Sequence, residues 1–261
     1  MTHPSVLVFA GLDPSGGAGI QADIQAISAA GVHTLPIVTA LTVQDNEHVQ
    51  AVHPVEPELL QAQTKVLIDA GMTIAAVKIG IVGSAANAQA IAGMIESLRQ
   101  RHPDLPVVLD PVLASGHGDT LTRGDAVAAL APLRRLATVI TPNLPEAAAL
   151  CAGARNDDER AQAMRVDAPH VLLKGGHGEG TTVINRWYSK TGCREWQWPR
   201  LPGGFHGSGC TLASAVAARL ALGKPVGDAI DDAQRWVQQA LATAYSIAAG
   251  QAIPNRLQEN S

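Results

Sequence analysis

The sequence predicts an α/β fold: a three-layer sandwich in which a mostly parallel central sheet is covered by helices on both faces. Short apolar runs alternate with longer, alanine-rich segments of helical composition along most of the chain. This alternation predicts βαβ units, whose parallel strands are buried on both faces. Glycine or polar residues follow most of the apolar runs, as expected for loops at the carboxyl ends of parallel strands.

The elements follow in chain order from these patterns. Strands are expected at residues 6–10, 35–41, 75–79, 106–109, 138–140 and 171–173. The segments between them predict helices at residues 19–30, 57–70, 85–101, 122–134 and 144–151. Alternation over residues 181–188 and 194–198 predicts a hairpin, and helices at 208–222 and 226–248 close the chain. The polar tail after Pro254 is expected to fray.

Length and composition favour one domain that acts on small molecules. A chain of 261 residues, 46% of them hydrophobic, can bury a full core, so residues 1–261 are expected to form a single domain. The net charge of −4, without a cluster of Lys or Arg, favours neither nucleic acid nor anionic lipid as a partner.

The cysteines and the N-terminal segment indicate in which cellular compartment the protein is expected. The three cysteines are far apart and odd in number, which argues against a disulfide framework and a cysteine-rich zinc site. The apolar run near the N-terminus is too short to cross a bilayer, and no basic segment precedes it. We expect a cytoplasmic protein without a membrane segment.

The segment Gly207-Ser208-Gly209-Cys210-Thr211 opens the helix expected at 208–222. Unpaired backbone N–H groups and the positive end of the helix dipole would point at one spot there, as an anion site requires. An ordinary glycine-bearing cap explains the same tetrapeptide equally well. The dipole would also favour a thiolate at Cys210, which could then accept a proton from a substrate hydroxyl, although a lone cysteine is often a small buried hydrophobe.

Three other loops carry polar groups with two interpretations each. Asn143 and Glu146 have the spacing of a capping box, and could also orient phosphates and the waters of a hydrated Mg²⁺. Lys174 is either a companion of nucleotide phosphates or a surface lysine in a turn. The glycine-rich loop at 11–19 fits neither a dinucleotide nor a Walker pattern and suggests a floor for a flat substrate, with Asp23 as a hydrogen-bond acceptor or a solvent-facing helix residue.

Six motifs in chain order carry a resemblance over nearly the whole chain. They are Ala10-Gly11-Leu12-Asp13-Pro14-Ser15-Gly16-Gly17-Ala18-Gly19-Ile20-Gln21-Ala22-Asp23, Lys78-Ile79-Gly80-Ile81, Val108-Leu109-Asp110-Pro111-Val112, Ile140-Thr141-Pro142-Asn143-Leu144-Pro145-Glu146-Ala147, Leu173-Lys174-Gly175-Gly176-His177 and His206-Gly207-Ser208-Gly209-Cys210-Thr211-Leu212. Together they resemble the ribokinase-like superfamily, and within it the hydroxymethylpyrimidine/phosphomethylpyrimidine kinases of thiamine biosynthesis.

The resemblance implies ATP, Mg²⁺ and two successive phosphorylations, first of 4-amino-5-hydroxymethyl-2-methylpyrimidine and then of its monophosphate. It also implies a homodimer. Cys210 matches the position at which related kinases carry a catalytic Asp. The resemblance gives Gly207, Ser208, Gly209 and Cys210 catalytic roles, Gly11, Asp23, Gln44, Ile81 and Val112 contacts with the pyrimidine, Asn143, Lys174 and Thr211 contacts with phosphates, and Asp110 and Glu146 water-mediated contacts with the metal.

The amide of Gln44 makes chemical sense, because one acceptor and two donors complement a ring nitrogen beside an exocyclic amine. A polar loop residue is the plainer interpretation.

The chain departs from the family pattern at several places. Ser208 stands where the family usually has Thr, Phe205 replaces a usual Thr, and Ile81 replaces a common Met. The stretch between Glu146 and Lys174 is shorter than usual. Two alternatives therefore stay open: a pyridoxal or pyridoxine kinase of the same superfamily, and a non-catalytic pyrimidine-binding protein.

Overall fold

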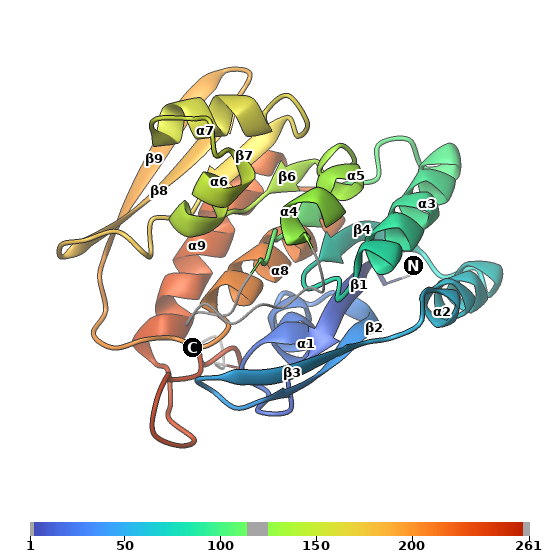
Figure 1. The fold of residues 1–261 in the computed structure, drawn as a ribbon, viewed down its shortest axis with the longest axis horizontal. Helices are drawn as coiled ribbons and strands as arrows, with labels where there is room; N and C mark the ends of the chain where they lie inside the picture. The colour runs from blue at the N-terminus through green and yellow to red at the C-terminus, as the bar shows by residue number, and fades with distance from the viewer. Residues whose placement is uncertain (1–2, 114–124, 258–261) are drawn as a thin grey trace.

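The computed structural model describes residues 3–113 and 125–257. Within them, nine strands form one sheet in the order β3-β2-β1-β4-β5-β6-β7-β8-β9 (Figure 1). The six strands from β2 to β7 in this order are parallel, and β3, β8 and β9 are antiparallel to their neighbours. The strands are β1 Ser5–Leu12, β2 His33–Gln44, β3 Val49–Pro54, β4 Ile74–Ile79, β5 Val107–Leu109, β6 Val139–Ile140, β7 His170–Leu173, β8 Thr182–Ser189 and β9 Gly192–Pro199.

The helices occupy the connections and the C-terminal third. They are α1 Gly19–Ala29, α2 Pro57–Asp69, α3 Ala85–Arg101, α4 Ala126–Ala129, α5 Ala131–Arg134, α6 Leu144–Leu150, α7 Asp157–Met164, α8 Ser208–Ala221 and α9 Val226–Ala242. None of the helices within the described ranges has both the length and the hydropathy needed to cross a membrane.

Most predicted elements are confirmed, including all six buried strands, the hairpin β8–β9 and the bounds of α3. The structure adds β3 and α7, which the sequence analysis did not predict. The segment expected as one helix over 122–134 holds α4 and α5, and residues 122–124 lie outside the described part. Helix α9 ends at Ala242 because the chain then turns into a segment in which Tyr245 pairs with Ile253.

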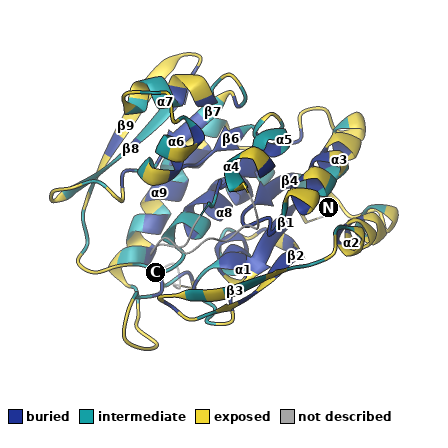
Figure 2. Cartoon of the chain, in the orientation of Figure 1, coloured by how far each residue is buried: buried dark blue, intermediate teal, exposed yellow. Residues whose placement is uncertain are grey.

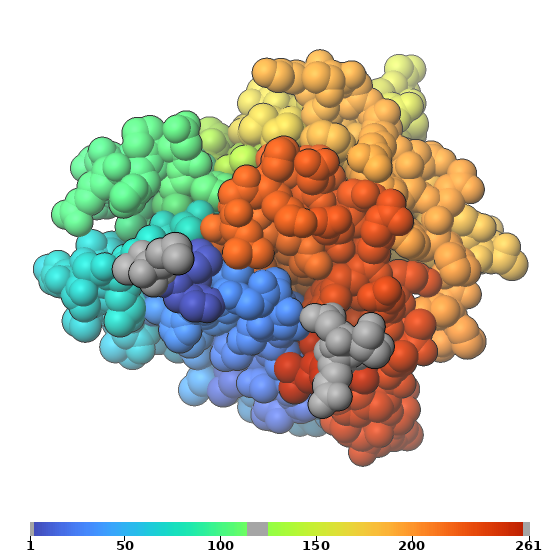
Figure 3. All heavy atoms as spheres, turned by 180° about the vertical axis from the view of Figure 1, so that it is seen from behind, coloured from blue at the N-terminus to red at the C-terminus, as the bar shows by residue number. Residues whose placement is uncertain are grey.

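Two apolar cores lie on opposite faces of the sheet, as the three-layer prediction requires. Along β1, Leu7 and Phe9 point into the core covered by α2 to α7, while Val6 and Val8 point into the core covered by α1, α8 and α9. The central strands are accordingly the most buried part, whereas the edge strands β3 and β9 and the outer helices carry exposed residues (Figure 2). From behind, the blue α1 region and the orange-red α8 and α9 lie side by side (Figure 3).

The C-terminal segment packs against the rest of the protein, so the prediction of a frayed tail is wrong for Asn255 and Arg256. The N–H groups of Tyr245 and Ile253 each donate to the other's carbonyl oxygen, at 3.0 and 2.8 Å. Arg256 is only 2% exposed. Its guanidinium donates hydrogen bonds to Thr211, Gln25 and Gly17.

Candidate active site

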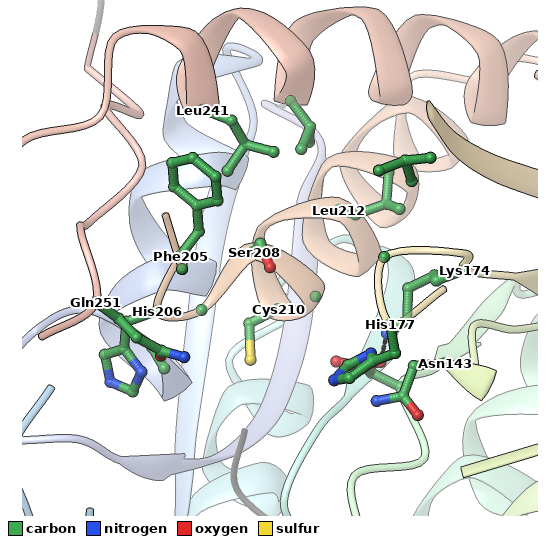
Figure 4. Close-up of a pocket in the computed structure, with 18 of the residues that line it drawn as sticks. Asn143, Lys174, His177, Phe205, His206, Ser208, Cys210, Leu212, Leu241 and Gln251 are labelled. Atoms are coloured by element: carbon green, nitrogen blue, oxygen red, sulfur yellow. Dashed lines mark hydrogen bonds and ion pairs between the residues drawn. The ribbon is translucent and has the colours of Figure 1, made fainter. Parts of the chain in front are cut away.

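A cavity of about 440 Å³ opens at the carboxyl ends of the parallel strands. It brings together loops from both halves of the chain, as the parallel topology predicts. Among the residues with predicted roles, those that line it are Gln44, Ile81, Asp110, Val112, Asn143, Glu146, Lys174, Gly207, Ser208, Gly209 and Cys210. In Figure 4, Asn143 and Lys174 lie on one side of Cys210, and His206 and Gln251 on the other.

The first turn of α8 forms the centre of this cavity. Its N-cap residue Gly207 has φ +75° and offers no side-chain hydrogen bond, so the backbone N–H groups of the turn stay available for an anion. A Cβ on Gly207 would lie 2.1 Å from the Gly17 carbonyl oxygen, and one on Gly209 would lie 3.1 Å from Lys174 Nζ. Glycines are needed here because the turn approaches both the glycine-rich loop and the lysine closely.

The glycine-rich loop is fixed by Asp13. The carboxylate of Asp13 accepts hydrogen bonds from the N–H groups of Ser15 and Ala18, each at 2.8 Å, and contacts His206 Nε2 at 2.7 Å. Burial opposes ionisation of Asp13, but the hydrogen bonds from His206, Ser15 and Ala18 outweigh it and lower its pKa. A Cβ on Gly17 would lie 2.3 Å from His206 Cδ2, so the loop docks directly on the residue before Gly207.

Lys174 forms an ion pair at the cavity wall. Its Nζ donates to Asp110 Oδ1 at 2.7 Å, and the same oxygen accepts a hydrogen bond from Thr141 Oγ1 at 3.1 Å. Burial would lower the pKa of Lys174, but the charges of Asp110 and Glu146 outweigh it and raise the pKa. The ammonium therefore stays charged beside the first turn of α8.

Asn143 and Glu146 form the predicted capping box at the start of α6. Glu146 N–H donates to Asn143 Oδ1 at 2.8 Å, and Asn143 N–H donates to Glu146 Oε2 at 2.7 Å. Burial, with a further contribution from Asp110, raises the pKa of Glu146 to about 7 against the opposing effect of Lys174. Two buried carboxylates that repel each other are a donor set that a divalent cation would stabilise.

The donors fit a hydrated Mg²⁺ better than a metal held by protein alone. Over the described ranges, no group of three or more His, Cys, Asp or Glu side chains is placed to hold a metal ion. Mg²⁺ is commonly bound by one or two carboxylates together with waters and substrate phosphates. Asp110 and Glu146 meet that requirement.

Cys210 differs from its prediction. The helix dipole was expected to favour the thiolate, but burial raises the pKa of the Cys210 thiol to about 11. The positive charge of Lys78 lowers this pKa, whereas the negative charges of Asp23 and Asp110 raise it. The expectation of a thiolate is wrong for the free protein, because the desolvation of the group outweighs the dipole.

Three predicted contact residues lie behind the cavity wall instead of lining it. Asp23 is fully buried, and both of its carboxylate oxygens accept hydrogen bonds from Lys78 Nζ at 2.8 Å. Gly11 lies behind Ile81, whose Cβ is 3.6 Å from the place of a Cβ on Gly11. Thr211 is also fully buried. The structure thus corrects the expectation of direct ligand contacts for Asp23, Gly11 and Thr211.

Further site residues were missed by the sequence analysis. The pairing of Asp13 with His206 could have been suspected, since each belongs to a quoted motif. Arg200 donates to the carbonyl oxygens of Gly176 and Gly178, at 2.7 and 2.8 Å, and so holds the loop after β7. No motif marks Arg200, and its partners are 24 and 22 residues away in the sequence.

Comparisons with known proteins identify the family of this chain. Residues 13–255 match the family model of phosphomethylpyrimidine kinase. The hydroxymethylpyrimidine/phosphomethylpyrimidine kinase of Mycobacterium tuberculosis H37Rv is 39% identical over 260 residues, which cover 96% of this chain and 92% of that protein. The thiamine biosynthesis multifunctional protein ThiED of Corynebacterium efficiens is 37% identical over 258 residues; 96% of this chain matches, but the chain spans 34% of that protein.

Two solved structures share the fold. The ADP complex of Bacillus subtilis pyridoxal kinase superposes with a TM-score of 0.84 at 28% identity, over 98% of this chain and 99% of that chain. Phosphomethylpyrimidine kinase from Clostridium difficile 630 gives a TM-score of 0.76 at 30% identity, over 91% of this chain and 99% of that chain. With the family model covering nearly all of the sequence, the chain belongs to the phosphomethylpyrimidine kinase family.

Proposed function

We propose that this protein transfers the γ-phosphoryl group of ATP to the hydroxymethyl oxygen of 4-amino-5-hydroxymethyl-2-methylpyrimidine, and then phosphorylates the monophosphate, in thiamine biosynthesis. One observation carries the proposal: a single cavity holds the N–H groups of the first turn of α8, the Lys174 ammonium and the Gln44 amide. Phosphoryl transfer is catalysed chiefly by positioning and electrostatic stabilisation, and these groups supply both.

Gln44, Ile81 and Val112 form the proposed pyrimidine half of the cavity. The amide of Gln44 presents one acceptor and two donors, which complement an aminopyrimidine edge. Ile81 is held in place because Thr39 Oγ1 donates to its carbonyl oxygen at 2.5 Å. Asn87 Nδ2 holds the neighbouring backbone, because it donates to the carbonyl oxygens of Val82 and Thr39, at 3.0 and 3.1 Å. The position of Ile81 in the pocket is therefore fixed by hydrogen bonds within the protein before any ligand binds.

The opposite half suits a nucleotide. Phe205, Leu212, Val237 and Leu241 line an apolar part of the same cavity, which fits a purine base (Figure 4). Lys174 lies beside the first turn of α8, its Nζ 3.1 Å from the place of a Cβ on Gly209, where nucleotide phosphates would reach it.

We propose that Asp110 and Glu146 hold Mg²⁺, largely through water, when nucleotide is bound. The ion would neutralise negative charge on the phosphates. The residues of the chain have separate tasks: the N–H groups of residues 207–210 stabilise the transferred group, and Lys174 neutralises a phosphate oxygen. Because its thiol is neutral in the free protein, we give Cys210 a different role: it contacts the hydroxymethyl group of the substrate and orients it.

Coupled ADP-release assays with the aminopyrimidine, its monophosphate and pyridoxal test the proposal. Turnover of both pyrimidines is expected. Turnover of pyridoxal alone would favour the pyridoxal kinase alternative. That alternative is included because a pyridoxal kinase shares this fold with a TM-score of 0.84. Saturable pyrimidine binding without any turnover would instead identify a non-catalytic binding protein.

The variant Gln44→Met tests the substrate assignment. It removes the amide but keeps a side chain of similar length, so turnover of the aminopyrimidine should fall about tenfold more than that of pyridoxine. Kinetic constants for both substrates measure this, with Gln63→Met, on helix α2, as the matched control. Equal losses for the two substrates would exclude the proposed role of Gln44.

Three broader expectations complete the proposal. We propose that the protein works in the cytoplasm, as one domain and as a homodimer. The exposed Leu41 and Val43 on β2, 49% and 47% accessible, form an apolar strip that suits a second copy. Sedimentation equilibrium would measure the oligomeric state.

A further inference from the structure

The last described residues of the chain lie against the segment that leads into α8. The N–H of Ala252 donates to the Gly204 carbonyl oxygen at 2.9 Å, and the N–H of His206 donates to the Ala252 carbonyl oxygen at 2.9 Å. Asn46, on the pyrimidine side, donates to the Gln251 carbonyl oxygen at 3.1 Å. The C-terminal segment thus connects the two halves of the cavity.

Arg256 ends this segment with a buried guanidinium, 2% exposed. Its Nε donates to Thr211 Oγ1 at 2.8 Å, its Nη1 donates to Gln25 Oε1 at 3.1 Å, and its Nη2 donates to the Gly17 carbonyl oxygen. Thr211 Oγ1 in turn donates to the Gly207 carbonyl oxygen at 2.7 Å. Arg256 therefore ties α1, the glycine-rich loop and the first turn of α8 together.

The charge of Arg256 is compensated only from a distance: burial opposes ionisation and lowers the pKa, whereas Asp23 and Asp13 favour the ionised form. Among residues 3–113 and 125–257, no carboxylate forms an ion pair with it, and all three of its hydrogen-bond acceptors are neutral. Its Nη2 lies 2.9 Å from the place of a Cβ on Gly207, next to the positive end of the α8 dipole. Two buried positive centres side by side are costly unless an anion lies in front of them.

We propose that Arg256 is a positioning residue for phosphoryl transfer. It fixes Gly17 and Thr211, and through them the Gly207 turn, and it adds positive charge behind the N–H groups that hold the phosphoryl group. Arg256 does not line the cavity and touches no substrate. The kinetic part of this inference rests on the proposed kinase function, but the anion-binding part does not.

The experiment compares Arg256→Met and Arg256→Lys with wild type and with Arg155→Gln, whose side chain is 86% exposed. Calorimetry with inorganic phosphate measures the affinity of the anion site at the first turn of α8. Calorimetry with the aminopyrimidine measures the affinity of the pyrimidine half of the cavity, and ADP release gives kcat and KM. For Arg256→Met we expect a phosphate Kd raised about tenfold and a kcat lowered about 100-fold, with aminopyrimidine affinity within twofold of wild type. The kcat of Arg256→Lys should be about tenfold higher than that of Arg256→Met, because the positive charge remains.

Two results would overturn the proposal. The first is a phosphate Kd and a kcat of Arg256→Met that both lie within threefold of wild type. The second is a loss of aminopyrimidine affinity as large as the loss of phosphate affinity, which would indicate general disruption of the site. If Arg256→Met does not fold, Thr211→Val decides, because it keeps the arginine and removes its link to Gly207. A kcat about fivefold lower supports the proposal, and an unchanged kcat contradicts it. If wild type turns over no substrate, the proposed function fails, and the phosphate Kd values alone decide on Arg256.

Discussion

Two lysine–aspartate ion pairs lie close to the first turn of α8 and differ in their access to the cavity. Lys78 on β4 pairs with Asp23 on α1, and both side chains are 0% exposed. Lys174 after β7 pairs with Asp110 after β5, and their side chains are 12% and 2% exposed. Only the second pair lines the cavity.

The difference in exposure gives the two lysine–aspartate pairs different roles. In the sealed pair, Lys78 donates to both oxygens of Asp23, and Ser214 Oγ adds a third hydrogen bond at 2.7 Å. Burial would lower the pKa of Lys78, but Asp23 and other negative groups outweigh it and raise the pKa. The sealed pair therefore supports the structure, whereas the open pair is accessible to a phosphate oxygen that competes for Lys174.

The largest effect is expected when the sealed pair is broken. Lys78→Met leaves Asp23 as a buried carboxylate without its cation, which should lower the free energy of unfolding by about 3–5 kcal/mol. Urea denaturation followed by circular dichroism measures the change. Lys65→Met is the control, because the Lys65–Asp69 pair is 73% and 60% exposed and should contribute little.

The double variant Lys78→Met with Asp23→Leu sharpens the test, since removing both charges should recover most of the lost stability. A loss below about 1 kcal/mol in the single variant would contradict the assignment of a structural role.

Breaking the open pair should affect catalysis more than stability. Lys174→Met removes a charge that stabilises the transferred phosphate, and we expect kcat to fall about 100-fold. Thermal unfolding should shift far less than in Lys78→Met. ADP release and melting curves measure the two quantities, with the exposed Lys190→Met as control. A kcat within threefold of wild type would show that the two pairs do not differ in function.

The open pair also has a neighbour that titrates. Because the pKa of Glu146 is raised to about 7 in the folded protein from an ordinary 4.5, its protonated form contributes stability that is complete below pH 4.5 and is lost as the pH rises to about 7. The unfolding free energy of wild type, relative to Glu146→Gln, should therefore decrease by about 2 kcal/mol between pH 5 and 7.5.

The glutamine variant keeps the capping box, so it is a matched reference for Glu146. Denaturation in EDTA at several pH values makes the measurement. A difference that does not change with pH would mean that Glu146 has an ordinary pKa.

The sequence predicts best what depends on neighbours in the chain. The parallel strands are continuous apolar runs, and the capping box of Asn143 and Glu146 is a local pattern, so both are confirmed. Helix α7 was missed because half of its eight residues are charged, and β3 because its six residues are only partly buried or exposed. Neither element carries the apolar pattern by which the others were found.

The errors at the site have a different cause. Asp23 was placed in the cavity because a helix position does not reveal which way a side chain points in the fold. The dipole at Cys210 is visible in the sequence, but the burial that outweighs it arises only from tertiary packing. Arg256 could not be predicted, since its contact with Gly17 joins residues 239 positions apart.

The sealed pair has a consequence for the order of folding. Its two members are 55 residues apart, but Ser214 lies a further 136 residues after Lys78, on α8. Until that helix docks, Asp23 and Lys78 face water and gain little from each other. We therefore expect the pair to be desolvated only when α8 docks, and this contact is a long-range one that requires a large loop to close.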